Sequence, residues 1–192
     1  MSWDVASPRH RGPGAQEGSI GIVEVRLERP EDIPGIRAVQ NRAFGRPEEC
    51  AVVDRLRAVC EGLVSLVAVD EGQVVGHVLF SPAWIETGGG REVPGMGLAP
   101  LAVLPECQRQ GIGTELTKAG LAAIRQTPCP FVIVLGNPGY YPRFGFEPAS
   151  RRGIRCKWEV PDEAFMVLVL DEEAMRGVAG LAHYRPEWDA AT

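Results

Sequence analysis

One junction constrains the fold of this chain more than any other feature. The segment from Leu101 to Thr114 reads LAVLPECQRQGIGT, so a run of strand composition turns through glycines directly into a helix-forming run. At such a turn the unpaired N–H groups and the positive end of the helix dipole converge, and glycine lets an anion approach the backbone. Such a junction is suited to holding a phosphate group, and Arg109 can add a mobile positive charge to it.

Two better-known phosphate-binding motifs do not account for this loop. A Walker A loop needs G-x-x-x-x-G-K-[ST], and the dinucleotide fingerprint needs G-x-G-x-x-G. From Gly111 the chain continues Ile-Gly-Thr-Glu-Leu, which lacks the third glycine of the fingerprint. Glycine at a strand-to-helix turn can also serve tight packing alone. The glycines by themselves leave both interpretations open.

Strand-like and helix-like runs alternate around this junction. Hydrophobic periodicity and turn residues predict strands at 22–27, 63–69, 74–85, 97–104, 131–135 and 165–170, helices at 31–44, 48–60 and 111–126, and a short helical turn at 140–144. Pro100 cannot donate a ladder hydrogen bond, so we expect strand pairing to be interrupted there. This order indicates a mixed α/β fold without an internal repeat.

Three segments are expected along the chain. Residues 1–20 are rich in Gly, Pro, Ser and Arg and lack apolar periodicity, which is typical of a disordered leader. The folded domain is expected over residues 21–171. Residues 172–192 form a tail of uncertain structure, in which 172–175 fit one helical turn and 177–188 fit either an added strand or a docked tail.

The composition disfavours several classes of function. The 192 residues carry a formal net charge of −5, which argues against binding to nucleic acid or to an anionic membrane. The N-terminus shows no secretory signal, and the longest apolar runs are strand-length, far shorter than a membrane span. The five cysteines include no C-x-x-C pair and no neighbouring histidine cluster. We therefore expect reduced thiols, no metal site and a cytoplasmic location.

The residues that flank the glycines carry a resemblance to a known family. Gln108 to Gly113, QRQGIG, resembles the Q/R-x-x-G-x-G/A pyrophosphate loop of GNAT N-acetyltransferases, and it stands between the expected strand and the expected helix. The resemblance covers roughly Ile22 to Leu170. It implies a GNAT-like mixed central sheet flanked by helices, with a splayed strand pair that forms an acetyl-CoA cleft. It also implies that acetyl-CoA is bound by Leu101, Ala102, Val103, Gln108, Arg109, Gln110, Gly111, Ile112, Gly113, Thr114 and Asn137.

The segment after the next strand adds a candidate catalytic group. Residues 135–146, LGNPGYYPRFGF, resemble the asparagine, the tyrosine-containing turn and the Gly-Phe pair of the family, and this spacing aligns Tyr141 with the usual acid. A phenol has an ordinary pKa of about 10 and is protonated at neutral pH. The adjacent Tyr140 leaves an exchange of roles open, and both rings can also serve packing alone. Asn137 either hydrogen-bonds the coenzyme arm or caps a turn.

A general base is not identified by the resemblance. Many family members carry a glutamate on the strand before the loop, but residues 97–103 contain no carboxylate. Glu86, Glu48 and Glu49 are candidates that would act through water, although such residues are more often solvated surface charges. The base therefore stays unassigned.

Two further residues have chemistry that the resemblance does not use. His77 lies within a predicted strand and is a reserve candidate for proton transfer, although a lone strand histidine is more often a hydrogen-bonded structural residue. Cys107 borders the loop, where a helix N-terminus can lower a thiol pKa. We expect sensitivity to thiol reagents from Cys107 and no covalent catalysis.

The resemblance implies an enzyme that transfers the acetyl group of acetyl-CoA to a primary amine by direct transfer in a ternary complex. The acceptor is a small molecule, a peptide or a protein. Two alternatives stay open: a non-catalytic acyl-CoA-binding regulatory module, which the missing strand carboxylate favours, and a transferase of another acyl group. A homodimer is expected from the family alone.

Overall fold

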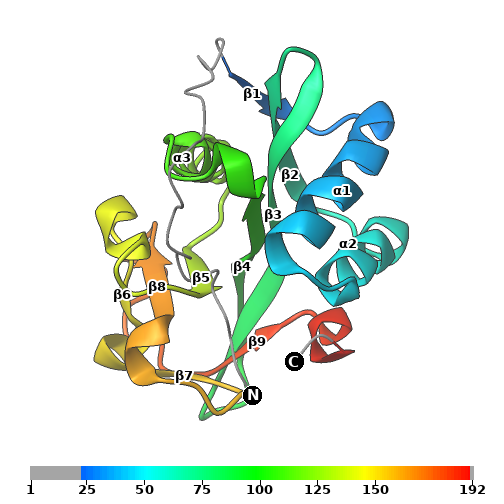
Figure 1. Ribbon diagram of the computed structural model, residues 1–192. Helices are drawn as coiled ribbons and strands as arrows, with labels where there is room; N and C mark the ends of the chain where they lie inside the picture. Colours follow the sequence, from blue (N-terminus) through cyan, green and yellow to red (C-terminus); the bar gives the residue numbers. More distant parts are fainter. Residues whose placement is uncertain (1–22, 191–192) are drawn as a thin grey trace.

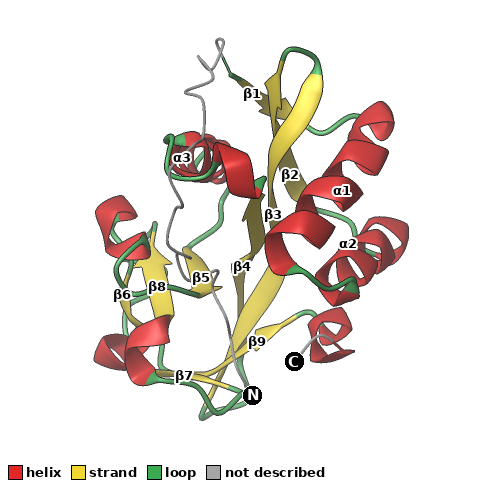
Figure 2. Cartoon of the chain, viewed as in Figure 1, coloured by secondary structure: helices red, strands yellow, loops and turns green. Residues whose placement is uncertain are grey.

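The computed structural model describes residues 23–190, and within them nine strands form one sheet (Figures 1 and 2). The expected leader at 1–20 and Ile22 lie outside the described residues. The strands are β1 (Glu24–Leu27), β2 (Val64–Asp70), β3 (Gln73–Thr87), β4 (Glu92–Val103), β5 (Phe131–Leu135), β6 (Glu147–Pro148), β7 (Ile154–Cys156), β8 (Phe165–Val169) and β9 (Gly180–Tyr184).

The sheet has the order β1-β2-β3-β4-β5-β8-β6, and β9 pairs with both β3 and β7 beside this path. The pairs β4–β5 and β7–β9 are parallel, and the other neighbours are antiparallel. The long β3–β4 hairpin runs through the centre of the molecule (Figure 1). β4 begins five residues earlier than the sequence predicts, because Glu92 already pairs with Glu86 across the glycine-rich turn.

Helices cover both faces of this sheet (Figure 2). In the described part of the chain the α-helices are α1 (Ile33–Phe44), α2 (Glu48–Val59) and α3 (Ile112–Ile124), close to the predicted bounds. Short 3₁₀ turns connect the elements: η1 (Pro30–Asp32), η2 (Pro105–Cys107), η3 (Tyr141–Phe144), η4 (Ala149–Arg152), η5 (Asp162–Ala164) and η6 (Pro186–Ala190). None of the helices between residues 23 and 190 is long and apolar enough to cross a membrane.

Alternate residues of the buried strands pack against different helices. On β3, Leu79 joins a cluster with the apolar face of α2, whereas Val78 and Phe80 join a cluster with α3. β5 divides in the same way, because Ile133 faces the α2 cluster and Val134 faces the α3 cluster. This period of two places hydrophobic cores on both faces of the sheet. The predicted mixed α/β fold with flanking helices is confirmed.

The parallel strands β4 and β5 separate beyond a short paired stretch. They pair only from Met96 to Leu98, opposite Val132 to Val134. The register between β3 and β4 also shifts here, since Val78 pairs with Leu101 and Phe80 with Leu98. Pro100 therefore lies in a bulge, as expected for a residue that cannot donate a ladder hydrogen bond. The predicted interruption at Pro100 and the predicted splay of these two strands are confirmed.

The segment after Asp171 is integrated into the fold. A turn at 172–177 leads to β9, which pairs with the far half of β3 from Ala83 to Thr87. η6 follows and contacts α2, and its Trp188 joins the core cluster that contains Val52, Val53 and Leu56 of that helix. The chain thus adds a strand and then docks its last described turn, which combines the two alternatives drawn from the sequence.

Candidate active site

A cleft of about 880 Å³ lies where β4 and β5 separate. The cleft is lined by the glycine loop before α3, by the turn between α1 and α2, and by the C-terminal segment. The middle is formed by Leu98 to Val103 on β4 and by the residues that follow β5. The predicted site residues that line the cleft are Leu101, Ala102, Val103, Gln108, Arg109, Gly111, Gly113, Thr114, Asn137 and Tyr141. Gln110 and Ile112 belong to the same loop but do not line the cleft.

The loop has a backbone shape that few residue types adopt. Arg109 has φ 62° and Gly111 has φ 88°, both in the left-handed region that favours glycine. The side-chain amide of Gln108 donates from Nε2 to the Val103 carbonyl oxygen at 3.1 Å, and the side-chain amide of Gln110 donates from Nε2 to the Glu106 carbonyl oxygen at 2.9 Å. The expected loop-shaping role of Gln108 thus has a direct structural counterpart, since its side chain ties the loop to the end of β4.

Several N–H groups of the loop are left available for a ligand. Within residues 23–190, the backbone N–H groups of residues 109–114 have no backbone acceptor, and Gly111 supplies no side-chain cap. The first N–H with a partner is that of Glu115, which donates to the Gly111 oxygen. A helix N-terminus with unpaired N–H groups attracts an anion. These residues fit a coenzyme pyrophosphate.

The free edge of β4 continues from this loop. The N–H of Leu104 donates to the Val75 carbonyl oxygen on β3, so by strand alternation Leu101 and Val103 direct their polar backbone groups to the opposite edge. β5 does not pair with that edge beyond Leu98. An extended ligand arm can therefore form strand-like hydrogen bonds along the cleft.

The two neighbouring tyrosines occupy different places. A Cβ atom at Gly113 would lie 3.1 Å from the hydroxyl oxygen of Tyr140, so this hydroxyl sits against the first turn of α3. It is buried without a hydrogen-bond partner among the described residues, and the guanidinium of Arg143 lies 4.7 Å from the ring centroid. Tyr140 thus belongs to the loop end of the cleft.

Tyr141 lies at the point where the strands separate. A Cβ atom at Gly136, directly after β5, would lie 2.4 Å from Cε2 of Tyr141, and the ring also packs edge-on against Tyr140 and Phe146. Only 7% of the residue is exposed. Burial raises the pKa of Tyr141 above that of a free phenol, and the nearby Tyr140 adds to this increase. The hydroxyl is therefore protonated at neutral pH. Asn137 accepts the Gly139 N–H at 2.7 Å, so it caps the turn while it lines the cleft.

One glutamate at the start of α2 lines the cleft. Glu49 is 9% exposed, its Oε1 pairs with Arg46 at 2.5 Å, and its Oε2 is buried without a partner among the described residues. Leaving a buried acceptor unsatisfied costs about 1–3 kcal/mol. Glu48 is exposed, and Glu86 lies at the far end of β3, 3.3 Å from His183. Of the three glutamates named from the sequence, Glu49 alone lines the cleft.

Three aromatic side chains of the same cleft were missed by the sequence analysis. Trp158, Tyr184 and Trp188 all line the cleft, and we call them the aromatic cluster. The rings of Trp158 and Tyr184 stack with centroids 5.4 Å apart, and the Trp188 indole N–H donates to Ser81 at 3.5 Å. These residues come from β9, η6 and the segment after β7, whose pairing the local pattern did not indicate. An excess of aromatic residues in the last third of the chain was the available signal.

His77 and Cys107 are now placed. His77 is fully buried, its Nδ1 lies 2.9 Å from the Gln40 amide nitrogen, and its Nε2 lies 2.9 Å from the Ser65 hydroxyl. These partners assign a neutral ring protonated on Nε2, and burial lowers the pKa of His77. It is structural and lies outside the cleft. The expected lowering of the Cys107 pKa is wrong, because burial raises the pKa of this thiol and the nearby carboxylates add to the effect.

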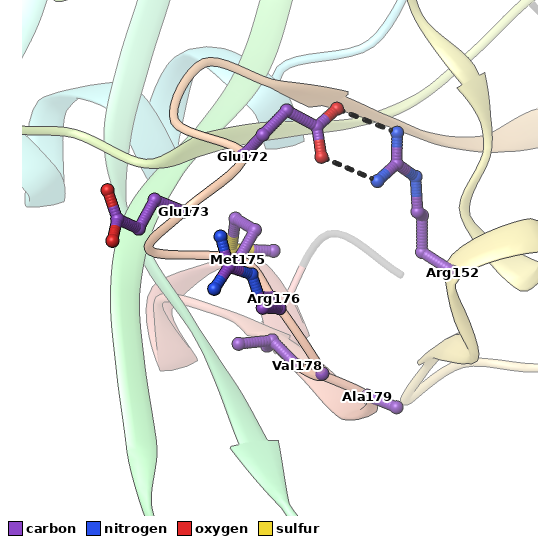
Figure 3. Close-up of a pocket in the computed structure, with 8 residues that line it drawn as sticks. Arg152, Glu172, Glu173, Met175, Arg176, Val178 and Ala179 are labelled. Atoms are coloured by element: carbon purple, nitrogen blue, oxygen red, sulfur yellow. Dashed lines mark hydrogen bonds and ion pairs between the residues drawn. The ribbon is translucent and has the colours of Figure 1, made fainter.

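A second cavity, of about 650 Å³, lies beside the turn after β8 (Figure 3). Arg152 spans it through paired hydrogen bonds to both carboxylate oxygens of Glu172 at 2.9 Å, and it also pairs with Glu147. None of the predicted site residues lines this cavity. Across residues 23–190 no group of three or more His, Cys, Asp or Glu side chains is arranged to hold a metal ion.

Comparison with known proteins agrees with this geometry. A family model described as an acetyltransferase (GNAT) domain matches residues 24–149. The uncharacterized N-acetyltransferase YhbS of Escherichia coli strain K12 is 38% identical over 166 residues, which cover 86% of this chain and 98% of the relative. The uncharacterized N-acetyltransferase YjhQ of the same strain is 41% identical over 136 residues, which cover 69% of this chain and 74% of the relative.

Two solved structures resemble the whole fold. The crystal structure of E. coli YhbS in complex with CoA superposes with a TM-score of 0.79 at 35% identity and covers 92% of this chain and 96% of that chain. A GNAT family acetyltransferase from Brucella melitensis in complex with acetyl-CoA gives a TM-score of 0.69 at 35% identity and covers 87% and 98%. The chain therefore belongs to the GNAT superfamily of N-acetyltransferases.

Proposed function

We propose that this N-acetyltransferase transfers the acetyl group of acetyl-CoA to a primary amine by direct transfer within the cleft. One observation carries the proposal: unpaired N–H groups at 109–114 stand at the end of an unpaired β4 edge, and that edge leads to Tyr141. The relatives crystallised with CoA and with acetyl-CoA support the identity of the coenzyme.

The residues of the loop bind the anionic end of the coenzyme. The N–H groups of residues 109–114 and the guanidinium of Arg109 hold the pyrophosphate. Leu101 and Val103 hydrogen-bond the arm as a neighbouring strand would. When bound, the coenzyme supplies an acetyl thioester with an activated carbonyl carbon.

The splay point, where β4 and β5 separate beyond Leu98, positions the reacting groups. The amine nitrogen forms a bond to the acetyl carbonyl carbon while the bond from that carbon to sulfur breaks. Outward N–H groups of β4 stabilise the negative charge that develops on the carbonyl oxygen. Tyr141 donates its hydroxyl hydrogen to the departing sulfur. It then takes up the proton that the amine nitrogen loses, so the proton count balances.

The high pKa of Tyr141 decides how it acts. A coenzyme thiol has a pKa near that of cysteine, about 8.5. A free phenol is already a weaker acid than this thiol, and burial of Tyr141 widens the difference. The main contribution of Tyr141 is therefore a hydrogen bond to the sulfur as charge develops, with proton transfer following. Direct transfer needs no cysteine nucleophile, and the raised pKa of Cys107 leaves its thiol protonated and poorly nucleophilic.

Replacement of Tyr141 by phenylalanine tests the proposal. Tyr141→Phe keeps the ring against Gly136 and removes only the donor, so we expect kcat to fall about 10²- to 10⁴-fold with acetyl-CoA affinity unchanged. The measurements are thiol release with a panel of primary amines and calorimetric titration of acetyl-CoA. Tyr140→Phe is the matched control and should retain kcat. Retention of kcat by Tyr141→Phe would refute the role of this hydroxyl.

Other features remain predictions from the sequence. They are the acyl-chain preference, a cytoplasmic location, a homodimer and the division at residues 20 and 171. Comparison of rates with acetyl-, propionyl- and succinyl-CoA tests the first directly.

A further inference from the structure

The cleft continues beyond the splay point to an end that the coenzyme site does not use. Tyr184 packs on Gly97, where a Cβ atom would lie 2.4 Å from its ring. Gly97 is six residues from Val103 along β4, a separation of about 20 Å in a strand. The end of the cleft at which Tyr184 packs is therefore well separated from the loop that holds the anion.

Glu49 gives this end its charge. Oε1 of Glu49 pairs with Arg46, whose side chain is 45% exposed and therefore partly open to solvent. Oε2 is buried, lacks a partner among the described residues, and belongs to a side chain that lines the cleft. A buried carboxylate oxygen without a donor is satisfied by a ligand N–H, and most strongly by a charged one.

The surroundings of Glu49 are mainly apolar. The aromatic cluster supplies broad ring surfaces, and η6 holds Trp188 against α2, the helix that also carries Glu49. The hydroxyl of Tyr184 is buried and has no well-formed hydrogen bond within residues 23–190, and burial raises its pKa well above the usual range, so it is neutral. Other apolar residues that line the cleft are Ala43, Phe44, Ala99, Pro100, Pro161 and Ala164, and the charged Arg46 lines it as well.

We propose that the acceptor is a small monoamine with an apolar or aromatic body, whose ammonium group is held by Glu49 and whose body lies against the aromatic cluster. This inference rests on the proposed function, because it names the second substrate of the same cleft. An ammonium group gains from a carboxylate and from nearby aromatic faces. A polyhydroxylated amine such as an amino sugar would bury hydroxyl groups against a wall that offers few partners for them.

Glu49 also receives a proton from the acceptor. The bound ammonium transfers one proton to Oε2 and becomes a neutral amine with a free electron pair. After the nitrogen–carbon bond has formed, the nitrogen loses a second proton, which restores Tyr141 after its donation to sulfur. Glu49 then releases its proton to water. One proton leaves per turnover, so charge and atoms balance.

Amine binding can be measured without catalysis. Trp158 and Trp188 line the site, so we expect 2-phenylethylamine to change the tryptophan fluorescence of the full chain in the presence of CoA. Glu49→Gln should weaken the binding of this amine about tenfold or more, because the charge-assisted hydrogen bond is lost. The same variant should bind uncharged 2-phenylethanol and CoA as the wild type does. Glu48→Gln, one residue away and exposed, is the matched control and should bind all three normally.

Substrate competition completes the test. In thiol release we expect kcat/KM for 2-phenylethylamine to exceed that for glucosamine and for a lysine-containing peptide by at least tenfold. Trp158→Leu should reduce this preference. The inference is overturned if glucosamine or the peptide is the better acceptor, or if Glu49→Gln loses no more amine affinity than Glu48→Gln. Different results would contradict the proposed function: the wild-type protein would not bind CoA, or Tyr141→Phe would keep full activity.

Discussion

A bulky residue at Gly111 should weaken coenzyme binding through the backbone alone. Gly111 has φ 88°, and a Cβ atom built there would meet nothing within 4 Å. Gly111→Val therefore introduces no steric clash, but it forces a β-branched residue into a conformation that such residues avoid. The loop will relax away from the shape that directs its N–H groups into the cleft.

The size of the effect follows from the cost of this conformation. Holding a non-glycine residue in a sparsely populated region of φ/ψ space costs about 1–3 kcal/mol. If the free loop relaxes, binding must restore the strained shape, and affinity falls by the same free energy. The expected loss in coenzyme affinity is about five- to 140-fold. Any part of the strain that the loop does not release appears as reduced stability of the free protein.

Gly72→Val is the matched control for this variant. Gly72 has φ 79° in the β2–β3 turn, and a Cβ atom there also meets nothing within 4 Å. In each variant the strain either lowers the free energy of unfolding, as measured by urea denaturation, or is relieved by local relaxation of the turn. Only Gly111→Val should weaken the binding of CoA, as measured by calorimetric titration. If Gly111→Val binds CoA with wild-type affinity, the loop is not the pyrophosphate site and the reasoning is refuted.

Two further predictions concern stability. Burial alone would raise the pKa of Glu28, but its interactions with His77, Arg57 and Ser65 outweigh this effect and lower the pKa to about 2. A lowered carboxylate pKa stabilises the fold above the unfolded value of about 4.3, and this contribution is lost as pH falls from there toward 2. Glu28→Gln should cost about 2–3 kcal/mol at pH 7 and about half as much at pH 3, measured by urea unfolding at both; equal losses would contradict this. Gly97→Ala should destabilise the fold by about 1–3 kcal/mol, because its Cβ atom would overlap the Tyr184 ring. It should also raise KM for the amine without changing CoA affinity, and an unchanged denaturation midpoint would contradict the overlap.

The parts of the fold with local signals were predictable. Helices α1, α2 and α3 have apolar faces with a helical period, and β5 and β8 are short apolar runs between turn residues. The loop at 108–113 could be found because its chemistry is carried by backbone and glycine within six residues. Pro100 likewise signals its bulge through the missing N–H.

Features that depend on distant pairing were not predictable. β9 is defined by hydrogen bonds to residues about 100 positions earlier in β3, so its five residues carry little local signal. The aromatic cluster forms only when that pairing exists. Glu49 was one of three candidate glutamates, and its distinction is the orientation of α2, which no single sequence displays. The error at Cys107 has the same origin, because burial depends on neighbours from other elements.

Amide hydrogen exchange with and without CoA tests the central claim most directly. The N–H groups of residues 109–114 have no backbone acceptor among residues 23–190, so they should exchange quickly in the free protein. Saturating CoA should slow their exchange at least tenfold, with the amides of the β2–β3 turn unchanged as an internal control. Slow exchange that appears elsewhere, with residues 109–114 unaffected at saturation, would contradict the assignment of this loop as the site of the coenzyme pyrophosphate.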